Sequence, residues 1–190
     1  MRVDLFDFEL PPERIAYAPA HPRDHAKLLH VSESLRDMQV FDLPSLLQPG
    51  DVLVMNDSRV IPARLFTQVG ERQVEVLLHQ PAAVPVGANY VEWTVFAKPA
   101  KKLKQGMVIS FAEDFSAEVV GRTEDGQVQL RFAMLPAQLF EKLRLHGHIP
   151  LPPYIARADE AADKVQYQTV YAAHDGSVAA PTAGLHFTEE

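Results

Sequence analysis

A series of short alternating segments between residues 65 and 134 constrains the fold most, because one face of each segment must find an apolar partner. In QVQLRF, Val128, Leu130 and Phe132 fall on one face of an extended chain, and polar residues fall on the other. RQVEVLL, YVEWTVFA, GMVISF and SAEVVGR add further strand segments, and Glu124–Gly126 is a tight hairpin signal. Several short strands spaced by turns predict a small antiparallel β-barrel.

The flanking sequence is typical of an α/β layer. Val52–Met55 is a continuous apolar run after a Gln-Pro-Gly-Asp turn, which fits a strand covered on both faces. Further along, Leu135, Leu139 and Leu143 lie on one helical stripe that Gly147 is expected to end. These segments predict helices packed on a sheet.

The fold class we predict is therefore an α/β domain, incomplete in this chain, with an inserted antiparallel β-barrel domain. Residues 1–64 and 135–190 would form the discontinuous α/β domain, and residues 65–134 the barrel. We expect truncation because the sequence stops where a helix is about to begin. Thr188 is a good N-cap, and two glutamates follow it in what would be the first turn.

Composition excludes several classes of protein. The 190 residues contain no cysteine, which excludes a disulfide framework and a thiolate metal site. No apolar run is long enough for a bilayer, and the N-terminus lacks the order of a signal peptide, so we expect a cytoplasmic protein. The formal net charge of −7 gives no general sign of a nucleic-acid binder.

One segment departs from this acidic background. AKPAKKLKQG contains four lysines and no acid. It could be a solvated loop between strands, or a patch that contacts the phosphates of a nucleic acid. The lysines are Lys98, Lys101, Lys102 and Lys104.

Polar residues follow the expected strand at Val52–Met55. Asn56, Asp57 and Arg59 offer an amide, a carboxylate and a five-donor guanidinium, and ligands of open α/β sheets bind at the carboxyl ends of strands. The alternative is a polar turn in which Asp57 caps the next segment and pairs with Arg59.

Two later segments add candidate ligand contacts. PLPPYIAR places Tyr154 on a stiff proline-rich wall, and YQTVYA supplies Gln168 and Tyr171, although both segments could equally be packed linker. In GSVAAPTAGLHFT, small residues allow close approach of a ligand, and His186 is the only side chain there of a residue type suited to proton transfer near neutral pH. A structural histidine is the alternative there. The residues alone predict a candidate small-molecule pocket and no specific activity.

Six segments in order carry a resemblance to a known family. They are DFELPPERIA, LQPGDVLVMNDSRVIPARL, AKPAKKLKQG, GHIPLPPYIAR, YQTVYA and GSVAAPTAGLHFTEE. The sequence resembles the S-adenosylmethionine:tRNA ribosyltransferase-isomerases of queuosine biosynthesis across all 190 residues. The resemblance implies an α/β domain with an inserted barrel, as the patterns do.

The resemblance also implies a reaction. The ribosyl unit of S-adenosylmethionine is transferred to the 7-aminomethyl-7-deazaguanine base at the tRNA wobble position and isomerised, which gives epoxyqueuosine-tRNA and releases adenine and methionine. S-adenosylmethionine is consumed as a cosubstrate, and no metal is used. The partner is tRNA carrying the prequeuosine base, and the complete protein is expected to be a monomer.

Site roles follow from that reaction. The sulfonium acidifies the adjacent carbon, so a base must remove a proton, and the cation favours carboxylates nearby. We expect His186 to transfer a proton and Asp57 to face the sulfonium or ribose. The expected substrate-binding residues are Asn56, Arg59, Arg64, Tyr154, Arg157, Gln168, Tyr171, Thr182 and Gly184.

The sequence departs from the family pattern in two places. RDHAKLL has Ala26 and Lys27 where the family usually has Ser-Arg, so bidentate anchoring by a guanidinium is lost there. Family chains also continue well past the HFT segment, so we expect this polypeptide alone to be inactive. A non-catalytic tRNA-binding barrel module and a purely structural fragment are the alternative functions.

Overall fold

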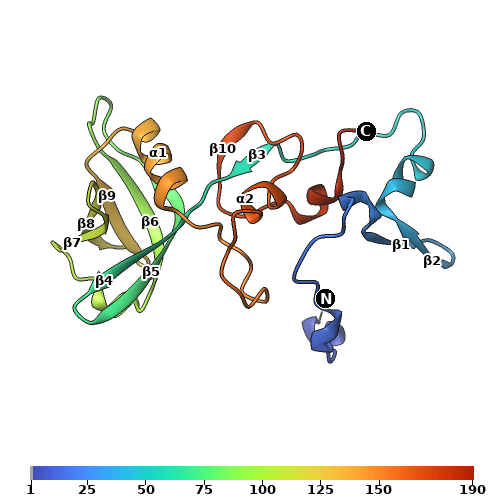
Figure 1. Cartoon of the computed structure of the whole chain (residues 1–190), viewed down its shortest axis with the longest axis horizontal. Helices are drawn as coiled ribbons and strands as arrows, with labels where there is room; N and C mark the ends of the chain where they lie inside the picture. The colour runs from blue at the N-terminus through green and yellow to red at the C-terminus, as the bar shows by residue number, and fades with distance from the viewer. Residues whose placement is uncertain (1) are drawn as a thin grey trace. The chain divides into compact units, whose positions relative to one another are not determined.

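The structure, a computed structural model, describes residues 2–190 as two compact units (Figure 1). We call the first the terminal unit: the residues up to Val54, with Leu151–Ala158 and His186–Glu190. The second, the barrel unit, comprises Met55–Pro150 and Asp159–Leu185.

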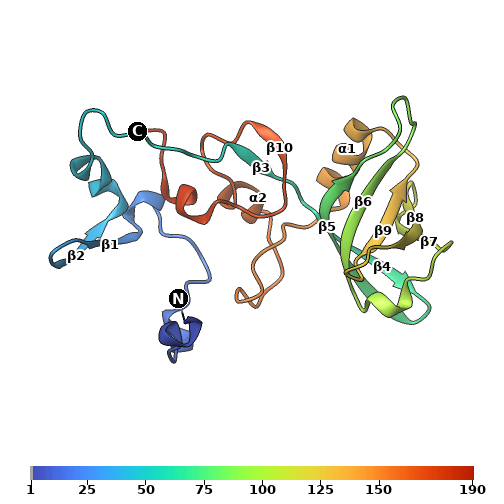
Figure 2. The same cartoon turned by 180° about the vertical axis from the view of Figure 1, so that it is seen from behind.

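The barrel unit is built on a six-stranded antiparallel sheet that curves until its edges nearly meet (Figure 2). At the seam, the buried hydroxyl of Thr67 donates to the backbone carbonyl of Ser110 at 2.7 Å. The prediction of an antiparallel barrel is confirmed. In spatial order the strands are β4 (Arg64–Val69), β5 (Arg72–Ala82), β6 (Val91–Lys98), β9 (Val128–Phe132), β8 (Phe115–Arg122) and β7 (Val108–Ala112).

The barrel core follows the alternation seen in the sequence. Val128, Leu130 and Phe132 are all fully buried, and the rings of Phe115 and Phe132 stack with centroids 5.7 Å apart. The hairpin signal at residues 124–126 is also confirmed. Gly126 turns the chain between β8 and β9 with a φ of 79°, which only glycine adopts readily.

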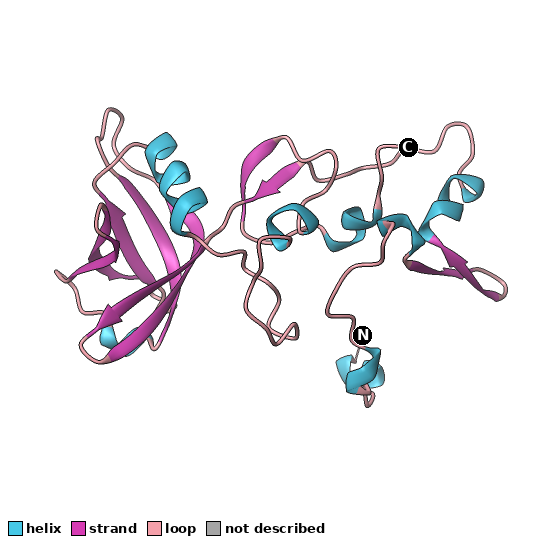
Figure 3. Ribbon diagram, viewed as in Figure 1, coloured by secondary structure: helices cyan, strands magenta, loops and turns pink. Residues whose placement is uncertain are grey.

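Helix α1 (Pro136–His146) packs beside the barrel (Figure 3). Leu139 and Leu143, on the predicted helical stripe, are buried in the same apolar core as the barrel strands, whereas Leu135 precedes the helix and is half exposed. The helix ends at Gly147, whose amide donates to the carbonyl of Leu143 at 2.7 Å. A side chain is excluded at Gly147, since a Cβ there would lie 2.0 Å from the carbonyl oxygen of Pro62.

A small parallel sheet completes the barrel unit. Strand β3 (Ser58–Val60) pairs with β10 (His174–Ser177), near the short helix α2 (Asp163–Gln166). Both hydrogen-bonding groups of the Gln168 amide bond to Val60: the oxygen accepts from its N–H at 2.9 Å, and the nitrogen donates to its carbonyl at 2.7 Å. The Gln168 side chain thereby satisfies the backbone N–H and carbonyl of Val60, as a neighbouring strand would. Two 3₁₀ turns, η5 (Ala100–Lys102) and η6 (Thr182–His186), lie in the remaining loops.

The terminal unit consists of one hairpin and several 3₁₀ turns. Among residues 2–190, strands β1 (Lys27–Val31) and β2 (Leu35–Gln39) pair only with each other. None of residues 2–54 is buried. The turns are η1 (Val3–Phe6), η2 (Pro12–Arg14), η3 (Arg23–His25) and η4 (Val40–Leu46).

The prediction of a buried strand at Val52–Met55 is wrong for this chain. The segment has no regular secondary structure and is paired with no strand of residues 2–190, and Val52 and Val54 are 83% and 92% exposed. An apolar run forms a central strand only where neighbouring strands and covering layers exist. The insertion of the barrel into an α/β domain stays a prediction. No helix among the described residues is long and apolar enough to cross a membrane.

Candidate functional site

The Asn56–Arg59 corner forms the start of β3 instead of following a strand. The Asn56 side-chain oxygen accepts from the amide of Ser58 at 2.9 Å and shapes the turn into the strand. The carboxylate of Asp57 lies 3.2 Å from Nδ1 of His174, and both side chains are exposed. The sequence did not indicate this pair, because the register of β3 against β10 creates it across more than one hundred residues.

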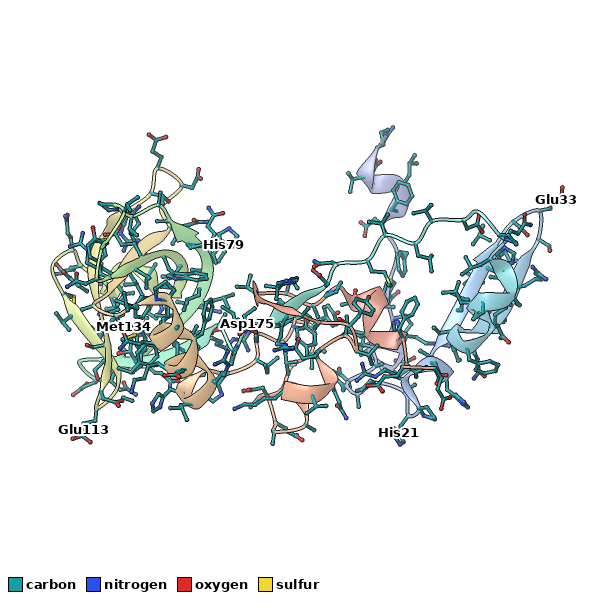
Figure 4. The ribbon with its side chains drawn as sticks, turned by 90° about the horizontal axis from the view of Figure 1, so that it is seen from above. His21, Glu33, His79, Glu113, Met134 and Asp175 are labelled. Atoms are coloured by element: carbon teal, nitrogen blue, oxygen red, sulfur yellow. The ribbon has the colours of Figure 1, made fainter. Side chains whose placement is uncertain are left out.

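Arg59 joins a second cluster in the barrel unit. Its guanidinium donates to the carbonyl of Ala172 at 2.8 Å and approaches Asp175 at 3.8 Å. Asp175, labelled in Figure 4, also accepts from Arg144 of α1 at 2.6 Å. These three charged residues line a hollow of about 190 Å³ together with Gln168 and Lys164. Sequence reasoning missed Arg144 and Lys164, because they come from separate helices with no local motif.

Three other predicted site residues have structural partners in the barrel unit. The Nε of Arg64 lies 2.9 Å from a carboxylate oxygen of Glu75. Gly184 is buried, and a Cβ there would lie 2.1 Å from the hydroxyl of Tyr171. Because Gly184 has no side chain, Tyr171 can lie against its backbone. Thr182 begins the same turn, η6.

His186 lines a separate hollow within the terminal unit. This hollow has a volume of about 480 Å³, which is in the range of small-molecule sites. Its wall is largely apolar, with Phe41 and Leu43 from η4, and the carboxylate residues Asp24, Glu189 and Glu190 also line it. Asp24 joins this hollow from a distant part of the chain, and the sequence around His186 gave no sign of it.

Tyr154 and Arg157 also belong to the terminal unit. Tyr154 is 56% exposed, and the guanidinium of Arg157 donates to the carbonyls of Ala158 at 2.9 Å and Tyr17 at 3.5 Å. Asp57 belongs to the barrel unit, so a cavity shared by Asp57 and His186 stays a prediction.

The four lysines gather on the loop between β6 and β7. Lys98 ends β6, Lys101 and Lys102 belong to η5, and Lys104 follows. Among residues 2–190, no three histidine, aspartate or glutamate side chains are grouped as metal ligands would be.

Comparison with known proteins defines the class. A family profile described as "Queuosine biosynthesis protein" matches residues 3–190. The chain belongs to this family of queuosine biosynthesis proteins. The resemblance inferred from the six sequence segments is confirmed.

Individual relatives are more specific. An S-adenosylmethionine:tRNA ribosyltransferase-isomerase of Rhodospirillum rubrum is 59% identical over 189 residues, which is 99% of this chain and 53% of that protein. The protein of the same name from Brucella ovis is 49% identical over 207 residues, covering 100% of this chain and 55% of that protein. The chain thus spans about half the length of the curated relatives it matches. A crystal structure of S-adenosylmethionine tRNA ribosyltransferase from Thermotoga maritima is 33% identical, covers 79% of this chain and 51% of that chain, and has a TM-score of 0.35.

Proposed function

We propose that the complete protein is an S-adenosylmethionine-dependent tRNA ribosyltransferase-isomerase. By the complete protein we mean a chain of the length of these relatives that contains these 190 residues. It would transfer the ribosyl unit of S-adenosylmethionine to the 7-aminomethyl-7-deazaguanine base of tRNA and isomerise it, giving epoxyqueuosine-tRNA, adenine and methionine. The observation that carries this proposal is the match to two relatives of that name over nearly the whole chain.

The hollow around His186 supports a role for this residue in proton transfer. The reaction needs a base at the carbon beside the sulfonium and a group that assists departure of adenine. A histidine with carboxylates in the same hollow can hold a proton in either of these steps, and the apolar wall would shield a nucleoside from water. We assign the proton transfer to His186 and a carboxylate facing the sulfonium or ribose to Asp57.

The other predicted residues would bind the substrate or position the residues that bind it. We propose that Arg59 and Arg64 contact substrate oxygens or phosphate, and that Tyr154 and Tyr171 line the base pocket. Gln168 would act through β3, because its amide is bonded to Val60. Asn56, Arg157, Thr182 and Gly184 complete the substrate-binding set.

The test is adenine release by the complete protein, measured by chromatography with S-adenosylmethionine and tRNA bearing the precursor base. His186→Ala should lower the rate by a factor on the order of 100, as loss of a general acid or base does. The control is His21→Ala, because His21, labelled in Figure 4, belongs to the same unit but is not among the residues that line the hollow. Wild-type adenine release by the His186 variant would remove its assignment.

A second candidate function is a non-catalytic tRNA-binding barrel, which the four lysines on one barrel loop favour. Calorimetry discriminates between the two. The enzyme should bind S-adenosylmethionine with measurable heat, and the binding module should not. We also propose that the 190-residue chain alone is inactive, because it spans about half the length of its relatives.

A further inference from the structure

The lysine loop, residues 98–106, has a defined shape. Leu103 is 2% exposed and anchors the middle of the loop in the barrel core. Its amide donates to the carbonyl of Ala100 at 3.0 Å, and the amide of Gly106 donates to the carbonyl of Val119 on β8 at 2.8 Å. The loop therefore presents its lysines from a fixed backbone and not from a mobile linker.

Arg122, at the end of β8, holds this loop from the side. Its NH2 group donates to the carbonyls of Ala100 at 2.7 Å and Leu103 at 3.2 Å, and its NH1 group donates to the carbonyl of Gly126 at 3.2 Å. One guanidinium thus joins the lysine loop to the β8–β9 turn. An ammonium group is a single point with no planar fork, so lysine at this position could not span the same three carbonyls.

A basic hollow lies beside this arginine. It has a volume of about 590 Å³, and its charged lining residues are Lys101, Lys104 and Arg122, with no carboxylate among the lining residues. The acids near these residues in sequence, Glu118 of β8 and Glu124 and Asp125 of the β8–β9 turn, are not among the lining residues. Three cations around one hollow on a protein of net charge −7 suit an anion with several oxygen acceptors.

We propose that this hollow receives a backbone phosphate of the tRNA substrate, and that Arg122 is a positioning residue that orients Lys101 and Lys104 toward it. This inference rests on the proposed function, which supplies tRNA as the ligand. It adds a place on the protein where the nucleic acid is held, and a residue that the lysine-rich segment did not reveal.

The test measures tRNA affinity of the complete protein by fluorescence anisotropy at several salt concentrations. Lys101→Ala and Lys104→Ala should each weaken binding several-fold and lower the slope of log affinity against log salt by about 1. Arg122→Lys keeps the charge but loses the three carbonyl bonds. Arg122→Lys should weaken tRNA binding about as much as the loss of one lysine. In the Arg122→Lys background, Lys101→Ala should reduce the tRNA affinity by a clearly smaller factor than it does in the wild type.

Controls separate positioning from general stability. Arg72→Ala removes an exposed cation of the same sheet that does not line the hollow, and should leave the salt slope nearly unchanged. If Arg122 were merely structural, Arg122→Lys would lower the unfolding temperature without weakening tRNA binding, and the inference would be wrong.

The inference would also be wrong if both lysine variants bound tRNA like the wild type while adenine release continued. That result would leave the proposed function standing. A wild-type protein that neither binds tRNA nor releases adenine would overturn both.

Discussion

The barrel unit and the terminal unit contain similar kinds of apolar residues, but they use them differently. In the barrel, Phe132 and Leu130 are fully buried, because the six strands alternate and the sheet curves until its edges nearly meet. In the terminal unit, Val3 and Phe8 are 84% and 73% exposed. Apolar content alone does not make a core; a second layer or a closed sheet must cover it. We therefore expect stability to be concentrated in the barrel unit.

The largest test of this contrast replaces one phenylalanine in each unit. Phe132→Ala should lower the free energy of unfolding of the barrel by about 3–5 kcal/mol, because it removes a fully buried ring. Phe8→Ala should change it by less than about 0.5 kcal/mol, since that ring is mostly in water already. Urea unfolding followed by the fluorescence of Trp93, the single tryptophan, reports on the barrel. Equal costs for the two variants would contradict the contrast.

Two glycines, one in each unit, extend the contrast between the units to the backbone. Gly147→Ala should destabilise the barrel by about 2–3 kcal/mol, because the new methyl group would meet backbone oxygens of Pro62 and Leu143 that cannot easily move. Gly50→Ala in the terminal unit meets no atom within 4 Å, although its φ of +101° is strained for alanine. The Trp93 unfolding transition should shift only for the Gly147 variant. A shift of the same size for Gly50→Ala would show that the two units unfold together.

The smallest effect concerns the attachment of α1 to the barrel. Lys142 of α1 donates to Asp114 in the β7–β8 turn, and this hydrogen bond holds the pKa of Asp114 below its usual value. A lowered folded-state pKa stabilises the fold above the unfolded pKa, and the gain is lost as pH falls through the folded pKa. Asp114→Asn should therefore lower the urea midpoint slightly near neutral pH and not at strongly acidic pH. A difference that grew on acidification would contradict this sign.

The barrel could be predicted because its information is local. Alternation in QVQLRF and a glycine turn at 124–126 specify strands and a hairpin without knowledge of the rest of the chain. Val52–Met55 shows the limit of that reasoning: the run is apolar, but the sequence does not say whether a partner strand is present. A strand pattern predicts a face to be buried, not the element that buries it.

The candidate site was harder to predict, because its pairs are made by tertiary structure. The resemblance indicated His186 and Asp57, but Asp24, which lines the same hollow as His186, and His174, which lies beside Asp57, come from distant segments. Arg122 carried no signal either, since its role depends on the carbonyls that the loop turns toward it. The sequence indicated the residue types of the site, but it did not indicate which residues lie near them in space.

Native-state hydrogen exchange of the 190-residue chain would show directly which elements carry its stability. We expect slow amide exchange in β4–β9 and in α1, where backbone hydrogen bonds lie over a buried core, and fast exchange throughout residues 2–54. Protection of the β1–β2 hairpin equal to that of β6 and β9 would contradict the claim that this chain carries its stability in the barrel.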